Sequence, residues 1–175
     1  MFRETAIAAL TITGVGILLH ALIARGARPR ARSSSPCPPW ARLVRGASAI
    51  LVLACVLGLA ATGLYCRLVL DAELSGTLLL LHVSLGGGLA GALVVFALTW
   101  AWDHAGPPGL WVRNAAFWLM VCAAVPMLLT ALLNMFPLWG TDWQGLVVEV
   151  HRLSGLTLTI CGAVWAYLTA RRVNT

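Results

Sequence analysis

Five long apolar runs dominate this sequence and restrict the folds that are open to the chain. They cover residues 5–24, 43–66, 76–102, 113–137 and 145–170. A helix of about 20 residues rises about 30 Å, which is the thickness of the hydrocarbon core of a bilayer. Only 10% of the residues are charged, whereas soluble domains carry about 25%. The sequence therefore predicts an all-α integral membrane protein with five transmembrane helices.

The first apolar run is predicted to be a retained helix and not a cleaved signal peptide. Positive charge is weak before the run, where Arg3 adjoins Glu4, and heavy after it, which is the reverse of the signal-peptide pattern. The stretch that follows is rich in Arg, Ser and Pro, so it is unsuited to forming an apolar core. We expect three parts: an N-terminal transmembrane helix (1–24), a basic cytoplasmic linker (25–41) and a four-helix membrane domain (42–175).

The distribution of charge predicts the orientation in the membrane. With the N-terminus outside, most arginines but only one acidic residue, Asp103, fall on the cytoplasmic side. Cytoplasmic loops of membrane proteins carry such an excess of positive charge. Tryptophans stand at predicted helix ends, as interfacial aromatic belts require: Trp100, Trp102, Trp111, Trp139 and Trp143. We expect a multi-pass protein of the bacterial inner membrane with its C-terminus inside. The excess of positive charge is then explained by topology, so we expect no nucleic-acid partner.

Two of the predicted helices carry the same pattern of glycine and histidine. In the first copy, residues 76–86, His82 lies six positions after the first glycine and four before the last. In the second copy, residues 145–155, His151 has the same two spacings. The helix before each copy ends in a similar triplet, Thr62-Gly63-Leu64 or Thr130-Ala131-Leu132. An internal repeat is a fold-level signal, and it predicts a bundle of four helices built from a repeated helical hairpin.

The two histidines are expected at one depth in the membrane. Both predicted helices run inward, and each histidine lies about 9 Å along the axis from its first glycine. Two neutral imidazoles at one height on parallel helices suit the two axial positions of one haem. Gly86 and Gly155, one turn after the histidines, would let a flat ring lie against the backbone. We expect one haem b, with His82 and His151 as its iron ligands. The competing interpretation is an old duplication whose repeated residues now only pack.

The five cysteines indicate neither a redox pair nor a covalently attached haem. They lie singly, without a CxxC or CxxCH motif, at Cys37, Cys55, Cys66, Cys122 and Cys161. Closely spaced pairs are the signature of zinc sites, disulfide oxidoreductases and c-type haems. We therefore expect the cysteines to be small core residues.

A longer set of cues connects residues 48–170 with a known family. The cues are the triplet at Thr62, the His82 helix, and the stretch Asn134-Met135-Phe136-Pro137-Leu138-Trp139-Gly140 leading to Val150-His151-Arg152-Leu153-Ser154-Gly155. This pattern resembles the membrane cytochrome b subunits that anchor respiratory formate dehydrogenases and hydrogenases. The resemblance implies a helical bundle that carries b haems and exchanges electrons with a quinone pool. Family members typically hold two haems; here only His20 with His104 stays open as a second pair.

Five polar residues near the two histidines are candidates for supporting roles. Arg67 and Arg152 fall on the outer side, where they would pair with haem propionates or serve as ordinary interfacial arginines. Glu149 would accept a proton from a quinol, or simply reach the headgroups by snorkelling. Asn134, with Thr130 one turn away, would hydrogen-bond across the bundle or hold a quinone carbonyl.

The function predicted from these residues is electron transfer within a larger complex. A haem with two histidine ligands has no open position for oxygen, and the short outer loops leave no room for a catalytic domain. We expect electrons to pass between quinone and a periplasmic partner, either a multihaem c-type cytochrome or an iron–sulfur subunit of a respiratory complex. The alternatives are a haem-free structural anchor subunit and a small transporter, although the ionisable residues cluster at one depth and form no path across the bilayer.

Overall fold

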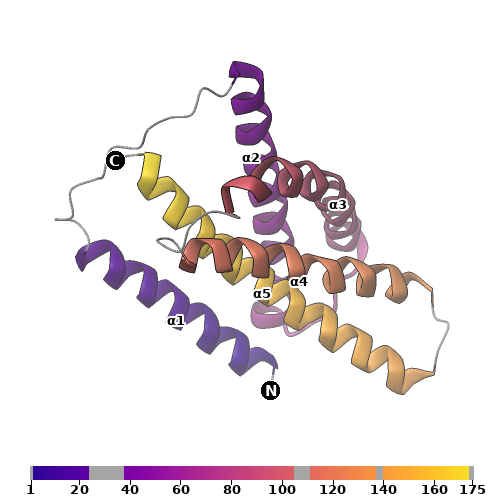
Figure 1. The fold of residues 1–175 in the computed structure, drawn as a ribbon. Helices are drawn as coiled ribbons and strands as arrows, with labels where there is room; N and C mark the ends of the chain where they lie inside the picture. Colours follow the sequence, from indigo (N-terminus) through magenta and orange to yellow (C-terminus); the bar gives the residue numbers. More distant parts are fainter. Residues whose placement is uncertain (1, 24–37, 105–110, 137–139, 174–175) are drawn as a thin grey trace.

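The computed structural model describes residues 2–23, 38–104, 111–136 and 140–173. All regular structure in these ranges is helical (Figure 1): α1 (Phe2–Ile23), α2 (Pro39–Leu64), the single π-helical turn η2 (Tyr65–Val69), α3 (Gly76–His104), α4 (Trp111–Met135) and α5 (Thr141–Val173). Five of the described helices are long and apolar enough to cross a membrane. The prediction of an all-α chain with five candidate spans is confirmed. Most of the linker predicted at 25–41 lies outside the described residues.

Helices α2 to α5 form two hairpins that pack against each other. The closest packing is within each hairpin, between α2 and α3 and between α4 and α5. The hairpins meet where α2 contacts α5 and where α3 contacts α4. This arrangement places α3 and α5 at opposite corners of a four-helix unit. We call the end at which α2 turns into α3 and α4 into α5 the hairpin end.

Helix α2 is longer than the apolar run that predicts it. It begins at Pro39, the first helical position, where the missing N–H of proline costs nothing because that group has no intrahelical partner. At its other end the helix continues into η2, where Cys66 is buried. The chain then reverses through Asp71 and Gly76, which both have positive φ values (46° and 56°). The sequence pattern predicts neither the early start nor the π-helical turn.

The aromatic core lies toward the end of the unit opposite the hairpin end. The Trp165 side chain is 1% exposed, and its ring centroid lies 5.0 Å from that of Phe96 and 5.1 Å from that of Trp100. Phe96 also contacts Phe117, with ring centroids 5.5 Å apart. These side chains come from α3, α4 and α5, so they join both hairpins. Edge-on aromatic contacts of this kind add to the stabilisation from burial.

The core stops short of the hairpin end. No residue of 76–88 in α3 or of 141–155 in α5 is buried, although every residue of both stretches is described. Buried side chains begin at Leu89 in α3 and at Leu156 in α5. The first three to four turns of these two helices are therefore loosely packed against the rest of the protein.

Helix α1 is an addition to the four-helix unit. It packs on α5 (Figure 1), and Ala6 is the only buried residue among its described side chains. In a bilayer, most of its surface would face lipid.

The described cysteines are free and have varied environments. Cys55 and Cys66 are buried, as predicted for small core residues, and Cys161 is half-buried. The prediction is wrong for Cys122, which is exposed on α4. Cys37 lies outside the described residues.

Candidate functional site

His82 and His151 lie together although they are far apart in the sequence. Their ring centroids are 6.3 Å apart and the ring planes are inclined by 62°. Both side chains are half-buried. They belong to α3 and α5, the two helices at opposite corners, so the imidazoles meet across the middle of the four-helix unit. The equal spacing of the two histidines within the repeat predicts this meeting.

The separation of the two rings suits ligands on opposite sides of one metal ion. With metal–nitrogen bonds of about 2.0 Å and a nitrogen about 1.1 Å from its ring centroid, two opposed imidazoles have centroids about 6.2 Å apart. The observed separation is 6.3 Å. A metal ion does not itself fix the angle between the planes of two imidazole ligands, so the 62° inclination is compatible with this arrangement.

Thr62 fixes which nitrogen of His82 carries the proton. The Thr62 hydroxyl donates to backbone carbonyls one turn earlier, at 2.8 Å to Gly58 O and 3.2 Å to Leu59 O. Its only hydrogen is used there, so at the 2.8 Å contact with His82 Nδ1 the hydroxyl accepts. His82 Nδ1 therefore carries the proton, and the lone pair of the neutral ring is on Nε2. This is the form in which a histidine binds a metal.

Thr130 has the same relation to His151 in the second hairpin. Its hydroxyl donates to Pro126 O at 2.6 Å and to Met127 O at 3.0 Å, and it accepts from His151 Nδ1 at 3.2 Å. His151 Nδ1 has a second acceptor, Met127 O, at 3.0 Å. Both hairpins thus leave the histidine Nε2 as the basic nitrogen, but His151 has two acceptors where His82 has one.

The predicted ring-facing glycines have different surroundings. A Cβ atom added to Gly86 would meet nothing within 4 Å, whereas one added to Gly155 would lie 3.8 Å from Met127 Sδ. Gly63 is the glycine closest to an imidazole, because a Cβ there would lie 3.4 Å from His82 Cε1. Gly86 thus adjoins free space, Gly155 faces α4, and Gly63 lets the His82 ring lie close to α2.

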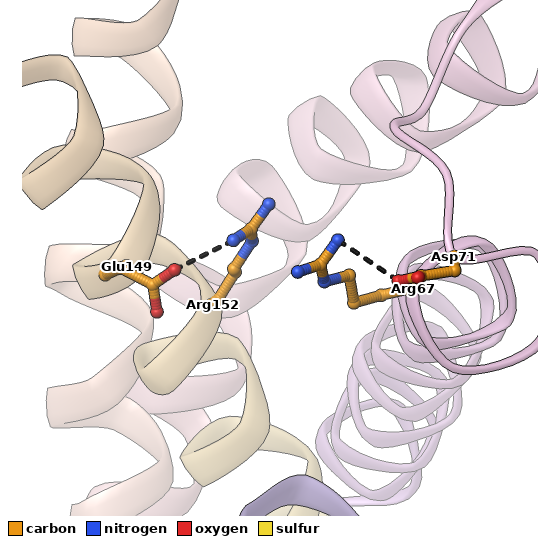
Figure 2. A network of polar contacts seen from close by, with 4 residues as sticks. All are labelled: Arg67, Asp71, Glu149 and Arg152. Carbon is orange, nitrogen blue, oxygen red and sulfur yellow. Dashed lines mark hydrogen bonds and ion pairs between the residues drawn. The ribbon is translucent and has the colours of Figure 1, made fainter. Parts of the chain in front are cut away.

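Two arginines extend toward one another near the hairpin end (Figure 2). Arg152 Nη1 lies 2.8 Å from Glu149 Oε1 on α5, and Arg67 Nη1 of η2 lies 3.5 Å from Oδ1 of Asp71, two residues after η2. Figure 2 shows each guanidinium directed away from its own helix toward the other hairpin. Arg67 Nε is buried and has no hydrogen-bond partner among the described residues. A buried donor without an acceptor suits an additional anionic group at this position.

Neither predicted quinone residue lines the cavity described between α4 and α5. Glu149 is held by Arg152, and Asn134 is exposed on α4. A cavity of about 520 Å³ lies between α4 and α5 and is lined by Thr130, Leu133, Trp143, Leu146, Val147 and Val150. Its lining includes Thr130, the hydrogen-bond partner of His151, but neither Glu149 nor Asn134.

The remaining histidines form no described pair. His20 contacts Tyr167 at the opposite end of the unit, with 3.0 Å between His20 Nδ1 and the tyrosine hydroxyl. The side chain of His104, the other half of the second pair left open by the sequence, lies outside the described residues. Within the described ranges, no group of three or more His, Cys, Asp or Glu residues could hold a metal ion.

The sequence interpretation overlooks the two threonines as partners of the histidines. It uses Thr62 only as a mark of a similar helix end, and it expects Thr130 to hydrogen-bond across the bundle or to hold a quinone carbonyl without naming His151 as its partner. Their spacing carries the signal, because Thr62 precedes His82 by 20 residues and Thr130 precedes His151 by 21. A threonine repeated with its histidine in each hairpin, at nearly the same separation, predicts a contact between them.

Comparison of the chain with protein-family models, with curated proteins and with solved structures finds no match. The candidate site therefore rests on the repeat and on the geometry of its residues.

Proposed function

We propose that this chain is a haem b-containing electron-transfer subunit of a membrane complex. The observation that carries the proposal is the pair of diagonal histidines, His82 and His151, with ring centroids 6.3 Å apart and both Nδ1 protons held by acceptors. A histidine that only fills space needs no fixed tautomer, whereas a metal ligand does. The same arrangement in both hairpins favours a shared ligand between them.

The surroundings of the histidines fit a large flat group better than a bare ion. Two nitrogens occupy only two coordination positions, and the four in-plane positions of a haem iron are filled by the porphyrin. The unburied stretches 76–88 and 141–155 and the open space at Gly86 leave room beside the rings. In this proposal His82 and His151 would hold the haem iron through Nε2, and Thr62 and Thr130 would orient the two rings. The bound haem would supply reversible one-electron storage.

Arg67 and Arg152 are proposed to hold the propionates. Each guanidinium keeps donors beyond the contact with its own carboxylate, since arginine has five N–H groups. Arg67 Nε in particular is buried without a described acceptor. Two converging positive groups would compensate two negative propionates and set the rotation of the ring about the histidine axis.

We place the site toward the periplasmic side, and we propose a quinone as one redox partner. The cavity between α4 and α5 has the apolar lining that a quinone ring requires. Thr130 lines this cavity, and its hydroxyl is hydrogen-bonded to His151. The other partner in this proposal is a multihaem c-type cytochrome or an iron–sulfur subunit at the periplasmic face. With His82 and His151 holding it, a haem would supply one-electron transfer, and the chain itself would perform no bond chemistry.

A haem-free structural subunit is the second candidate. It is supported by the hydrogen bonds of both Nδ1 atoms and by the ion pairs of both arginines, which already satisfy much of the polar surface near the hairpin end. In that case the chain would act as a membrane anchor for other subunits.

The visible spectrum of the purified protein distinguishes the two candidates. We expect a reduced-minus-oxidised α band typical of b haems, lost in His82→Ala and in His151→Ala and kept in the control His20→Ala. Because alanine variants could fail to fold, His82→Met is a second test: methionine remains a ligand, so the band should shift and not vanish. A colourless wild-type protein that elutes as a folded species, or a spectrum unaffected by all these changes, would refute the haem proposal.

A further inference from the structure

A polar cluster joins α1 and α5 at the end opposite the hairpin end. His20 Nδ1 lies 3.0 Å from the Tyr167 hydroxyl and 3.4 Å from Arg171 Nη1. Arg171 Nη2 donates to Ala21 O at 3.4 Å, and its guanidinium carbon lies 5.6 Å from the centre of the Tyr167 ring. Because Arg171 is only a donor, His20 Nδ1 accepts here, and the ring proton of neutral His20 is on Nε2.

An apolar cavity adjoins this cluster. It has a volume of about 330 Å³ and is lined by Thr13, Gly16, Ile17 and His20 of α1, Val112 of α4, and Val164, Tyr167 and Leu168 of α5. It therefore continues from the polar cluster along the seam between α1 and the four-helix unit. Ala6 is the only buried side chain described in α1, so protein contacts fill little of this seam.

The position of the cluster matches the depth of lipid headgroups. The candidate membrane span of α1 ends at Leu22 and that of α5 ends at Arg171, so His20 and Arg171 lie at the boundary of the apolar layer. Tyr167 lies 16 residues after His151 on the same helix, which is about 24 Å along the axis. The cluster is thus a separate place from the paired histidines, and no carboxylate contacts Arg171 within the part of the chain that the structure describes.

We propose that this cluster and cavity bind one anionic phospholipid, which fills the seam between α1 and α5. The phosphate would accept hydrogen bonds from Arg171 and from His20 Nε2, and an acyl chain would occupy the cavity. Basic pockets between transmembrane helices bind anionic headgroups in this way. The lipid would hold α1 against the unit, where direct packing is sparse. This inference does not depend on the haem proposal.

Native mass spectrometry of the full chain in detergent tests the proposal. The delipidated protein is mixed with phosphatidylglycerol or with phosphatidylcholine of the same acyl chains, and the retained lipid is measured. We expect one tightly held phosphatidylglycerol and little phosphatidylcholine. Charge-assisted hydrogen bonds to phosphate predict that Arg171→Gln lowers phosphatidylglycerol affinity about tenfold.

Matched variants separate recognition from general charge effects. Arg3→Gln removes the same charge from the other end of α1 and should leave the affinity unchanged, and Arg171→Lys should retain most of it. Circular dichroism checks that each variant is folded. Any of three results would overturn the proposal. The first is an equal loss of phosphatidylglycerol affinity in Arg171→Gln and Arg3→Gln. The others are equal retention of the two lipids by the wild type and a quinone held in place of lipid.

Discussion

Replacing Thr62 with valine tests the proposed role of the threonines most directly. Valine has nearly the same shape as threonine but no hydroxyl, so His82 Nδ1 loses the only acceptor described for it, at 2.8 Å. A buried donor without an acceptor costs about 1–3 kcal/mol. Loss of a hydrogen-bond partner behind a metal-ligating histidine lowers metal affinity by about 10- to 100-fold. We expect Thr62→Val to weaken haem binding within this range.

Thr130→Val is the matched comparison, because His151 Nδ1 has a second acceptor and His82 Nδ1 has none described. His151 Nδ1 keeps Met127 O as an acceptor, at 3.0 Å, after the Thr130 hydroxyl is removed. The loss should then be that of one ordinary hydrogen bond, about 0.5–1.5 kcal/mol. We expect a smaller loss of affinity in Thr130→Val than in Thr62→Val, and near-normal binding in Thr62→Ser.

Haem titration of the apoprotein measures both affinities, and the midpoint potential reports on the ligands themselves. If His82 holds a haem as proposed, removing the acceptor would make it a poorer electron donor to iron, so the potential should rise in Thr62→Val. A purely structural threonine would change thermal stability without changing the potential. If Thr62→Val and Thr130→Val bind haem equally well, or if Thr62→Ser behaves like valine, the reasoning about the tautomer is wrong.

Three further substitutions test the fold and the proposed propionate site. In Gly58→Ala the new Cβ would lie 2.7 Å from Leu85 Cδ1, the end of a flexible side chain that can turn away, and alanine favours a helix over glycine by about 1 kcal/mol, so we expect little loss in thermal unfolding; a large loss would contradict this packing of α2 on α3. Trp165→Ala removes a fully buried aromatic side chain and should cost about 3–5 kcal/mol, measured by unfolding in detergent; no change in midpoint would contradict the assignment of the core. Arg67→Gln with Arg152→Gln should lower haem affinity while keeping both axial ligands, so the α band should remain but haem should dissociate faster. Unchanged dissociation would show that the propionates lie elsewhere.

The sequence predicts the helices well because their length is set by the bilayer. Each span follows from a run of apolar residues that needs no knowledge of its neighbours. The meeting of His82 and His151 is also predictable, since equal spacing from the start of two similar helices gives equal depth. Both inferences use only distances along a helix.

Features that depend on packing between helices are not predictable in this way. The spacing of Thr62 and Thr130 from their histidines hints at a contact, but which nitrogen each hydroxyl meets is set only when the hairpins close. From the sequence, two roles stay open for Glu149: accepting a proton or reaching the headgroups. In the structure its carboxylate forms an ion pair with Arg152, one turn later on α5. The cluster of His20 with Tyr167 and Arg171 joins residues more than 140 positions apart, and no local pattern indicates it.

The two hairpins are each well packed internally and less so against each other, which has a consequence for biogenesis. Each hairpin is suited to enter the membrane as a unit and to associate with the other afterwards. A cofactor bound by His82 of one hairpin and His151 of the other would hold the two hairpins together. Because it would bind only the associated form, it would shift the equilibrium toward that form. A cell short of that cofactor would then accumulate chains whose hairpins meet at the aromatic core but stay apart at the hairpin end, a form that membrane proteases distinguish from the finished subunit.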